Sequence, residues 1–217
     1  DAAHSFGSRN SNGSMVGSKS DIAIFSFDPV KNITCIDGGV IIAQEKKHAV
    51  RLRNMRQLGQ MQNQEKLYSN DRSYTYDVED IGFRYHLANL HAAIGIEQMK
   101  KIKEIKEKKQ KIFSNYLLGI NNNYITLPPA LDGDILPFIF VLRLKDKRDE
   151  FIEYCSEKNI DTGIHWQPGH QFSYLRSCKF EDLSVTEKIG NQIVTIPMYP
   201  DLTETEQLYI IDVINKF

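Results

Sequence analysis

Short apolar runs interrupt a largely polar chain of 217 residues and predict its first elements. Residues 21–27 (DIAIFSF) follow a stretch rich in glycine and serine, and Pro29 ends this run. Residues 39–43 (GVIIA) form a second run that starts at a glycine pair. Both runs are short, apolar and rich in β-branched residues, which is typical of buried strands. We therefore predict two neighbouring buried strands, one on each side of a turn that contains Lys31.

Helical patterns follow the second strand. Residues 45–58 are basic and helical in pattern, whereas residues 59–80 are polar and aromatic and predict a long loop. Apolar residues then recur at near-helical spacing and predict one long helix from about residue 86 to 118, with its end at Gly119. This helix is a natural boundary, so we expect three parts: residues 1–85, a connecting helix at 86–119, and residues 120–217.

The third part alternates strands and helices. Its strand-like runs are residues 124–127, 137–144, 160–165 and 193–196, with a helical pattern at residues 147–158. Ser184 with Glu187, and Thr203 with Glu206, have the spacing of capping boxes and predict the starts of two more helices. A small α/β unit is therefore expected at the end of the chain.

Composition limits the possible partners. The 27 lysines and arginines nearly balance the 28 aspartates and glutamates, so no broad attraction to nucleic acid or anionic lipid is expected. Residues 100–111 (KKIKEIKEKKQK) are basic, but isoleucines at helical spacing and interspersed glutamates favour the solvated face of an amphipathic helix. The longest apolar runs fall far short of the roughly 20 residues that cross a bilayer. Neither nucleic acid nor membrane is a predicted partner.

The cysteines indicate a reducing environment. Cys35, Cys155 and Cys178 are odd in number and far apart, which fits neither a disulfide framework nor a paired metal site. A cytoplasmic location follows, and Cys35 is expected to be a buried packing residue. The chain begins at Asp1, without an initiator methionine, in a segment that looks like the exit from a strand. We therefore expect an upstream part of the protein to be missing from it.

Lys31 is the strongest candidate for chemistry. It follows an apolar strand at a turn enforced by Pro29, a place that can hold an amine at the edge of a sheet. A lysine that forms a Schiff base must lose its proton, and partial burial beside other cations lowers its pKa toward neutrality. The alternative is an ordinary solvated lysine, since lysine is rarely buried.

Five segments in a fixed order favour the interpretation of Lys31 as a Schiff-base lysine. They are DAAHSFG at residues 1–7, DIAIFSFDPVKNITCIDGG at 21–39, GFRYHLANLHAAIG at 82–95, DTGIHWQPGH at 161–170 and IPMYPDLTETE at 196–206. Together they resemble the DegT/DnrJ/EryC1/StrS family of sugar aminotransferases, which depend on pyridoxal 5'-phosphate (PLP). The resemblance implies an α/β fold of the fold-type I, aspartate aminotransferase-like class. This chain would hold part of the large PLP-binding domain and the whole small domain.

The resemblance also implies roles for individual residues. Asp1 matches the aspartate that meets the pyridine nitrogen of PLP, and Lys31 matches the lysine that carries the cofactor and moves the substrate proton. Ser26 matches a serine that binds the cofactor phosphate, although a simple strand-end hydroxyl is the alternative. His4 matches a residue near the ring oxygen of PLP, with a simple turn histidine as the alternative.

Other matches are weaker. Where many relatives have an asparagine that reaches the phosphate in the neighbouring subunit, this chain offers Arg84 and His86, and a structural role for either is equally open. A homodimer with active sites at the subunit interface is still implied. His165, Trp166 and His170 match a substrate-contacting stretch, although a lone tryptophan is more often a packing residue. Two histidines without nearby carboxylates or thiols do not indicate a metal site.

The implied reaction is transfer of an amino group from L-glutamate to a keto-6-deoxy sugar carried on a nucleotide. The 4-keto sugar is favoured over the 3-keto sugar, and the product would feed lipopolysaccharide O-antigen or natural-product sugars. A family relative that only senses PLP or a nucleotide sugar is an alternative, as is a sugar dehydratase, but the dehydratases have histidine where this chain has Lys31. In relatives an N-terminal portion supplies a phosphate loop and a ring-stacking aromatic, so the 217 residues alone are expected to be inactive.

Overall fold

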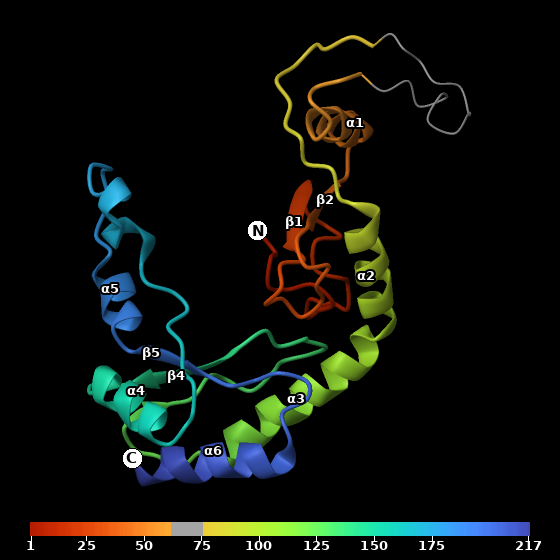
Figure 1. The fold of residues 1–217 in the computed structure, drawn as a ribbon. Helices are drawn as coiled ribbons and strands as arrows, with labels where there is room; N and C mark the ends of the chain where they lie inside the picture. Colours follow the sequence, from red (N-terminus) through yellow and green to blue (C-terminus); the bar gives the residue numbers. More distant parts are fainter. Residues whose placement is uncertain (62–75) are drawn as a thin grey trace. The chain divides into compact units, whose positions relative to one another are not determined.

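A computed structural model describes residues 1–61 and 76–217 of the chain, which form two compact units, Asp1–Ile102 and Lys103–Phe217 (Figure 1). Most of the loop predicted at residues 59–80 lies outside the described residues. None of the described helices combines the length and apolar character of a bilayer-spanning segment. The division into units falls inside the connecting helix predicted at 86–119, and the three-part domain division stays a prediction.

The first unit is built on a two-stranded antiparallel sheet. Strand β1 (Ile22–Ser26) pairs with β2 (Gly39–Ala43), so that Ile24 faces Ile41 across the ladder. The bounds agree with the predicted strands because proline and glycine mark their ends. One face of β1 packs Ala23 and Phe25 against Ala2, with Phe6 and Val16 at the edge of this cluster.

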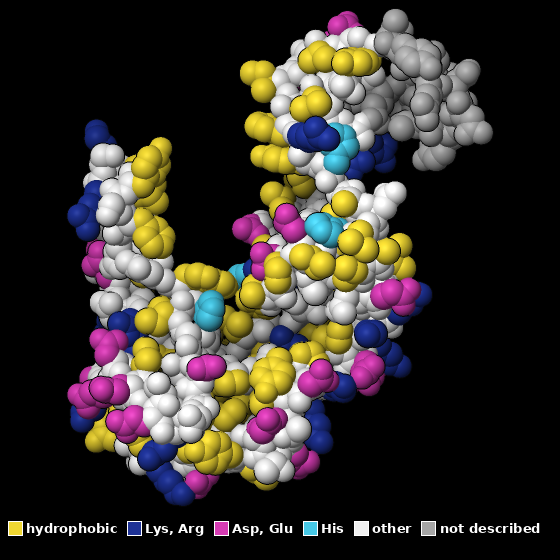
Figure 2. Space-filling model, in the orientation of Figure 1, with side chains coloured by type: hydrophobic (Ala, Val, Ile, Leu, Met, Phe, Trp, Pro, Cys, Tyr) yellow, Lys and Arg dark blue, Asp and Glu magenta, His cyan; other side chains and the backbone are white. Residues whose placement is uncertain are grey.

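The other face of this sheet is exposed, contrary to the prediction of two buried strands. Ile22, Ile24 and Ile41 are each nearly half exposed, and Val40 and Ile42 of β2 are exposed as well. Hydrophobic side chains are correspondingly prominent on the surface of this unit (Figure 2). An apolar run is compatible with burial on both faces but does not guarantee a second covering layer.

Helix α1 (Lys46–Met55) follows β2, and α2 (Asn89–Lys100) ends the first unit. The second unit starts within the next helix, α3 (Ile102–Gly119). The single helix predicted from residue 86 to 118 is therefore two helices, which separate at Lys101. No glycine or proline marks this break, and the helix end at Gly119 was predicted correctly.

The second unit has a three-stranded antiparallel sheet in the order β3 (Ile125–Thr126), β4 (Phe140–Leu144), β5 (Ile193–Ile196). Helices α4 (Arg148–Glu157), α5 (Ser184–Gly190) and α6 (Glu204–Lys216) complete it, with two short 3-10 turns at Gly169–Gln171 and Ser173–Leu175. Its fully buried core side chains include Tyr116, Phe140, Leu142, Phe151 and Ile214. The predicted small α/β unit is thus observed.

Helices α3 and α6 are joined by polar as well as apolar contacts. The Gln207 side chain donates to the Ile112 carbonyl at 2.7 Å and accepts from the Asn115 amide at 2.9 Å. The Tyr116 hydroxyl donates to the Pro197 carbonyl at 2.7 Å, and burial raises the pKa of this phenol. The buried polar groups in this interface are therefore paired, as interior packing requires.

Two predictions for the second unit were wrong. Residues 160–165 do not form a strand; only Gly163 pairs, through an isolated bridge, with Thr195. Polar residues interrupt that run, so it has too little apolar surface for a strand. The box at Ser184 is also absent, because the helix starts at Ser184 and Asp182 accepts its backbone N–H at 3.0 Å.

The box at Thr203 is confirmed. The Thr203 hydroxyl accepts from the Glu206 backbone N–H at 3.2 Å, and the Glu206 carboxylate accepts from the Thr203 backbone N–H at 2.8 Å. Hydrogen bonds from Thr203 to this carboxylate lower the pKa of Glu206.

Candidate active site

Lys31 lies on a loop that hydrogen bonds close at both ends. The Phe27 backbone N–H donates to the Gly38 carbonyl at 2.8 Å, and the Phe27 carbonyl accepts from the Cys35 N–H at 3.0 Å. The Lys31 N–H donates to the Asp28 carbonyl at 3.0 Å, which forms the turn itself. The lysine side chain is half-buried. A flexible four-carbon side chain is thereby held on a fixed backbone, as a covalent attachment point requires.

The turn is reinforced by short side chains on the N-terminal side of Lys31. The Asp28 carboxylate accepts from the Val30 N–H at 3.1 Å, and the Ser26 hydroxyl accepts from the Asp28 N–H at 3.3 Å. Such bonds from aspartate and serine to nearby N–H groups are typical of turns. Ser26 therefore occupies the exit of β1, where the loop that contains Lys31 begins.

Cys35 anchors the far side of the loop. It is only 2% exposed, and a Cβ placed on Gly38 would lie 2.5 Å from its sulfur. A Cβ on Gly95 of α2 would lie 3.3 Å from the Cys35 Cβ, so the loop and the helix are closely packed. Burial, followed by the charge of Asp37, raises the pKa of the Cys35 thiol. Its interpretation as a packing residue is confirmed.

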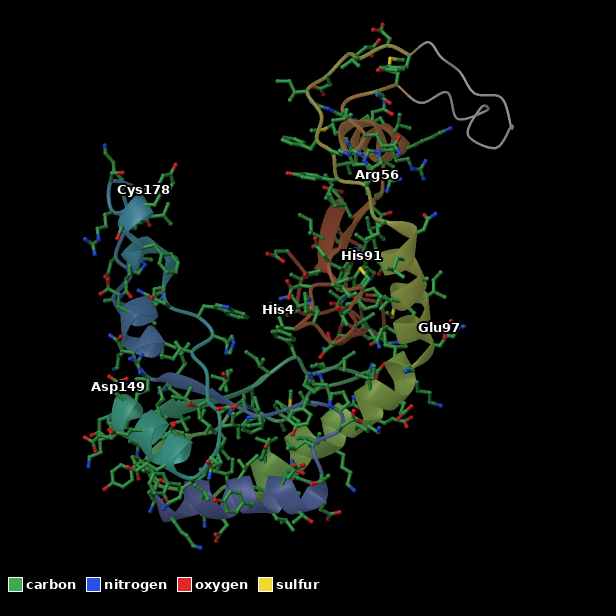
Figure 3. All side chains as sticks on the ribbon, viewed as in Figure 1. His4, Arg56, His91, Glu97, Asp149 and Cys178 are labelled. Atoms are coloured by element: carbon green, nitrogen blue, oxygen red, sulfur yellow. The ribbon has the colours of Figure 1, made fainter. Side chains whose placement is uncertain are left out.

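The start of the chain is bound to the same strand. The Ala2 N–H donates to the Ile24 carbonyl at 2.9 Å, and the Asp1 carboxylate accepts from the Ala3 N–H at 2.9 Å. His4 lies in the following turn, beside the sheet of this unit (Figure 3). Through these bonds, Asp1 comes next to the strand whose end presents Ser26 and leads to Lys31.

Arg84 and His86 lie on an exposed segment paired with the end of α1. The Phe83 N–H donates to the Met55 carbonyl at 2.6 Å, and the Tyr85 N–H donates to the Arg56 carbonyl at 3.0 Å. Residues 83–90 are all exposed, and these include both predicted phosphate ligands. The phosphate role and the structural role of these two residues both stay predictions.

The base of this segment is tightly closed. Gly59 has a φ of 73°, and a Cβ on Gly82 would lie 1.9 Å from the Gly59 nitrogen. The Met61 N–H donates to the Asp77 carbonyl at 2.9 Å. The Asp80 carboxylate accepts from the Arg51 Nε at 2.9 Å, and this arginine lowers the pKa of Asp80. Residues 59–61 are therefore held against residues 77–82.

In the second unit, His165 is bonded to Thr195 of β5. Its Nδ1 lies 2.6 Å from the Thr195 hydroxyl, which in turn donates to the Gly163 carbonyl at 2.9 Å. Since a hydroxyl has one proton, Nδ1 of His165 is the donor in this chain of bonds, and Nε2 is left as an acceptor in the neutral ring. A histidine in this tautomer can accept a proton or a hydroxyl hydrogen bond.

A hollow of about 490 Å³ lies beside His165. Segment 159–165, the end of β5 and the start of α6 form its walls. Asp161, Glu206, Tyr199 and Tyr209 line it, together with apolar residues such as Leu202 and Ile210. Hydroxyl-rich molecules suit this mixture of acceptors and aromatic faces.

Trp166 and His170 have other partners. The Trp166 ring stacks on the Phe138 ring, with centroids 6.5 Å apart and planes 7° from parallel. His170 Nε2 lies 2.9 Å from the Glu187 carboxylate. The ring centroids of His165 and Trp166 are 5.0 Å apart, whereas His170 is bonded to Glu187 of α5. The sequence did not indicate that Phe138 and Thr195 contact these residues, and it predicted Glu187 to be part of a capping box.

Residues 1–61 and 76–217 contain no group of three or more His, Cys, Asp or Glu side chains placed to hold a metal ion.

Solved structures of fold-type I PLP aminotransferases share the fold of this chain. Residues 1–215 match the model of the DegT/DnrJ/EryC1/StrS aminotransferase family, so the chain belongs to that family. The resemblance and the fold class predicted from sequence are both confirmed.

Several solved structures of aminotransferases are similar to this chain over nearly its whole length. A DegT DnrJ EryC1 StrS aminotransferase from Brucella abortus is 25% identical with a TM-score of 0.86, and the alignment covers 100% of this chain and 56% of that one. DesV from S. venezuelae is 27% identical with a TM-score of 0.84, covering 99% and 56%. PseC from Helicobacter pylori, an aminotransferase involved in the biosynthesis of pseudoaminic acid, is 21% identical with a TM-score of 0.89, covering 100% and 58%.

Among curated proteins, MJ1066 of Methanocaldococcus jannaschii is 28% identical over 226 residues, covering 100% of this chain and 58% of that protein. The chain thus spans somewhat more than half the length of the relatives that it matches.

Proposed function

We propose that the complete protein transfers an amino group from L-glutamate to a keto-6-deoxy sugar nucleotide, using PLP attached to Lys31. The 4-keto sugar is the favoured substrate over the 3-keto sugar. One observation carries the proposal: the closed loop presents Lys31 at the end of β1, and the Ala2–Ile24 hydrogen bond holds Asp1 beside the same strand. The proposed setting is the cytoplasm, and the proposed product is a sugar for lipopolysaccharide O-antigen or natural products.

The residues present fit the chemistry of PLP. An amine, a carboxylate and a hydroxyl are what its aldehyde, ring nitrogen and phosphate respectively need, and Lys31, Asp1 and Ser26 supply them from one strand and its attached segments. His4, in the turn after Asp1, is the proposed neighbour of the ring oxygen (Figure 3). When bound, PLP supplies a ring that withdraws electrons from the substrate carbon.

The chain's own residues have distinct tasks in this proposal. The Asp1 carboxylate holds a proton on the pyridine nitrogen, because a negative charge nearby favours the protonated ring. The Lys31 amine, once released from the cofactor, accepts a proton from the substrate carbon and returns it as general base and acid. The Ser26 hydroxyl accepts from the Asp28 N–H and can donate its own proton to a phosphate oxygen.

The remaining proposed contacts come from Arg84, His86 and the segment 165–170. Arg84 or His86 would supply positive charge to the phosphate of a partner subunit in a homodimer. His165 and Trp166 would contact the sugar nucleotide, with His165 Nε2 accepting a hydroxyl proton. His170 would also contact the sugar nucleotide, with its ring held by the bond to Glu187.

Covalent labelling of the complete protein tests the central assignment. PLP is added, the linkage is reduced with borohydride, and peptides are mapped by mass spectrometry. We expect the pyridoxyl group on Lys31 alone, and no stable labelling of Lys31→Ala. Lys19→Ala, a change in the exposed loop before β1, is the matched control and should label normally. Labelling elsewhere, with Lys31 unmodified, would reject the assignment.

The second step is amino transfer. L-Glutamate should convert the long-wavelength absorbance of the bound cofactor to that of its amine form, and a nucleotide-linked 4-keto sugar should restore it. A protein that binds PLP at Lys31 but shows neither change would instead be a sensor of the cofactor.

A further inference from the structure

We propose that Lys109 is a positioning residue for Trp166 and acts through Phe138. Lys109 lies on α3, in the basic run that the sequence predicted to be a solvated helical face. Only 5% of its surface is exposed, so this prediction was wrong for Lys109. A buried lysine needs a specific partner, because removing a charge from water is costly.

The partner of Lys109 is the loop before β4. Its Nζ donates to the Phe138 carbonyl at 2.8 Å and lies 5.9 Å from the centroid of the Phe138 ring. One ammonium group therefore contacts both the backbone and the aromatic ring of the same residue. A cation over a ring face is attractive, and the attraction is stronger away from water. Lys109 thus restricts the position and the tilt of Phe138.

Neighbouring residues of α3 hold the same loop. Lys106 Nζ donates to the Asp134 carbonyl at 3.1 Å, and the Gln110 side chain donates to the Ile135 carbonyl at 2.7 Å. Positions 106, 109 and 110 share one face of a helix, since residues three and four apart are neighbours. This face of α3 holds the backbone of the loop at Asp134 and Ile135, and Lys109 holds it at Phe138, shortly before β4 begins.

Phe138 in turn determines where the tryptophan ring can lie. The two rings are parallel to within 7°, and Trp166 is 51% exposed, so a large part of its surface is available to a ligand. Trp166 follows His165, which borders the hollow of this unit. Moving Phe138 would remove the ring on which Trp166 stacks. It would also change the angle between the rings of Trp166 and His165.

Tryptophan fluorescence measures this directly, because Trp166 is the only tryptophan in the chain. For Lys109→Met, we expect emission at longer wavelength and stronger quenching by acrylamide than in the wild type. Lys111→Met changes an exposed lysine of the same helix and should leave both quantities unchanged. Phe138→Leu removes the stacking ring but keeps the carbonyl that Lys109 binds, and should reproduce the change.

Circular dichroism would identify a Lys109→Met protein that fails to fold. In that case Lys109→Arg, which keeps the cation, is used in place of Lys109→Met. Its emission should be closer to that of the wild type than the emission of Phe138→Leu is. The proposal is overturned if folded Lys109→Met has wild-type emission and quenching while Phe138→Leu does not.

The consequence for catalysis rests on the proposed function. In the complete enzyme, Lys109→Met should raise the KM for the sugar nucleotide on the order of threefold or more, with kcat little changed, because it disturbs binding rather than proton transfer. PLP labelling at Lys31 should be unaffected. An altered fluorescence with unchanged KM would support the positioning of Trp166 and remove Trp166 from the substrate site. Loss of labelling at Lys31 would instead concern the proposed function.

Discussion

The backbone N–H of Cys35 donates to the carbonyl of Phe27 at 3.0 Å, and this bond closes the loop that presents Lys31. The cysteine side chain is buried beside Gly38, so the closure depends on the absence of a side chain there. Position 31 is therefore fixed by residues that have no chemical role of their own.

Gly38→Ala tests this closure. The new methyl group would lie 2.5 Å from the Cys35 sulfur and 3.0 Å from Leu87, so one of them must move. We expect a loss of about 1–3 kcal/mol in unfolding free energy, measured by urea denaturation, and weaker PLP labelling of Lys31. Gly169→Ala has nothing within 4 Å of the added atom and serves as control. Equal stability of the two variants would contradict the closure.

Thr203→Ala should destabilise the second unit by about 1 kcal/mol, because it removes the hydroxyl that caps α6. Ser184→Ala should cost less, since Ser184 is inside its helix rather than at the cap. Asp182→Ala should cost more than Ser184→Ala, since the Asp182 carboxylate accepts from the Ser184 N–H. Urea denaturation measures all three, and the reverse order for Thr203 and Ser184 would show that the box contributes little.

The stability of the second unit should depend on pH through Lys109. Burial lowers the pKa of Lys109 to about 8 from its ordinary 10.5. Between these values the unfolded chain keeps a proton that the folded chain has lost, so stability rises with pH in this window. From pH 8 to pH 10.5, the unfolding free energy of the wild type should therefore rise by roughly 3 kcal/mol more than that of Lys109→Met.

Denaturant unfolding at several pH values between about 7 and 10.5 measures this difference. Lys111→Met should follow the wild type, since its lysine is exposed. A parallel pH dependence of wild type and Lys109→Met would show that Lys109 keeps an ordinary pKa.

The three cysteines should react at very different rates with a thiol reagent. Cys178 is exposed, between the second 3-10 turn and α5, whereas Cys35 and Cys155 are buried (Figure 3). Burial raises the pKa of Cys155 to about 11, which also reduces its thiolate content. We expect one fast equivalent in the native protein and three in urea, with Cys178→Ser lacking the fast phase. A second fast thiol would show that one buried site opens readily.

The sequence was sufficient where local signals marked the elements. Strands β1, β2 and β5 are flanked by glycine, proline or polar turns, and Thr203 with Glu206 gave the start of α6. The motif around Lys31 predicted the family and the fold class, and both were confirmed.

Where the outcome depends on contacts between distant residues, the sequence failed. Lys109 is buried and donates to the carbonyl of Phe138, 29 positions away, and nothing in a run of lysines and glutamates indicates which one turns inward. His170 pairs with Glu187 across 17 positions, although the spacing of Glu187 suggested a cap. The break at Lys101 interrupts a periodicity that continues on both sides.

The contact between Gly59 and Gly82 has a practical consequence for protein engineering. Because a side chain fits at neither glycine, a redesigned variant has to keep glycine at both positions, whatever is changed elsewhere around α1. The Met61–Asp77 hydrogen bond and the Arg51–Asp80 ion pair join the same two segments, so Arg84 and His86 keep their register against the end of α1.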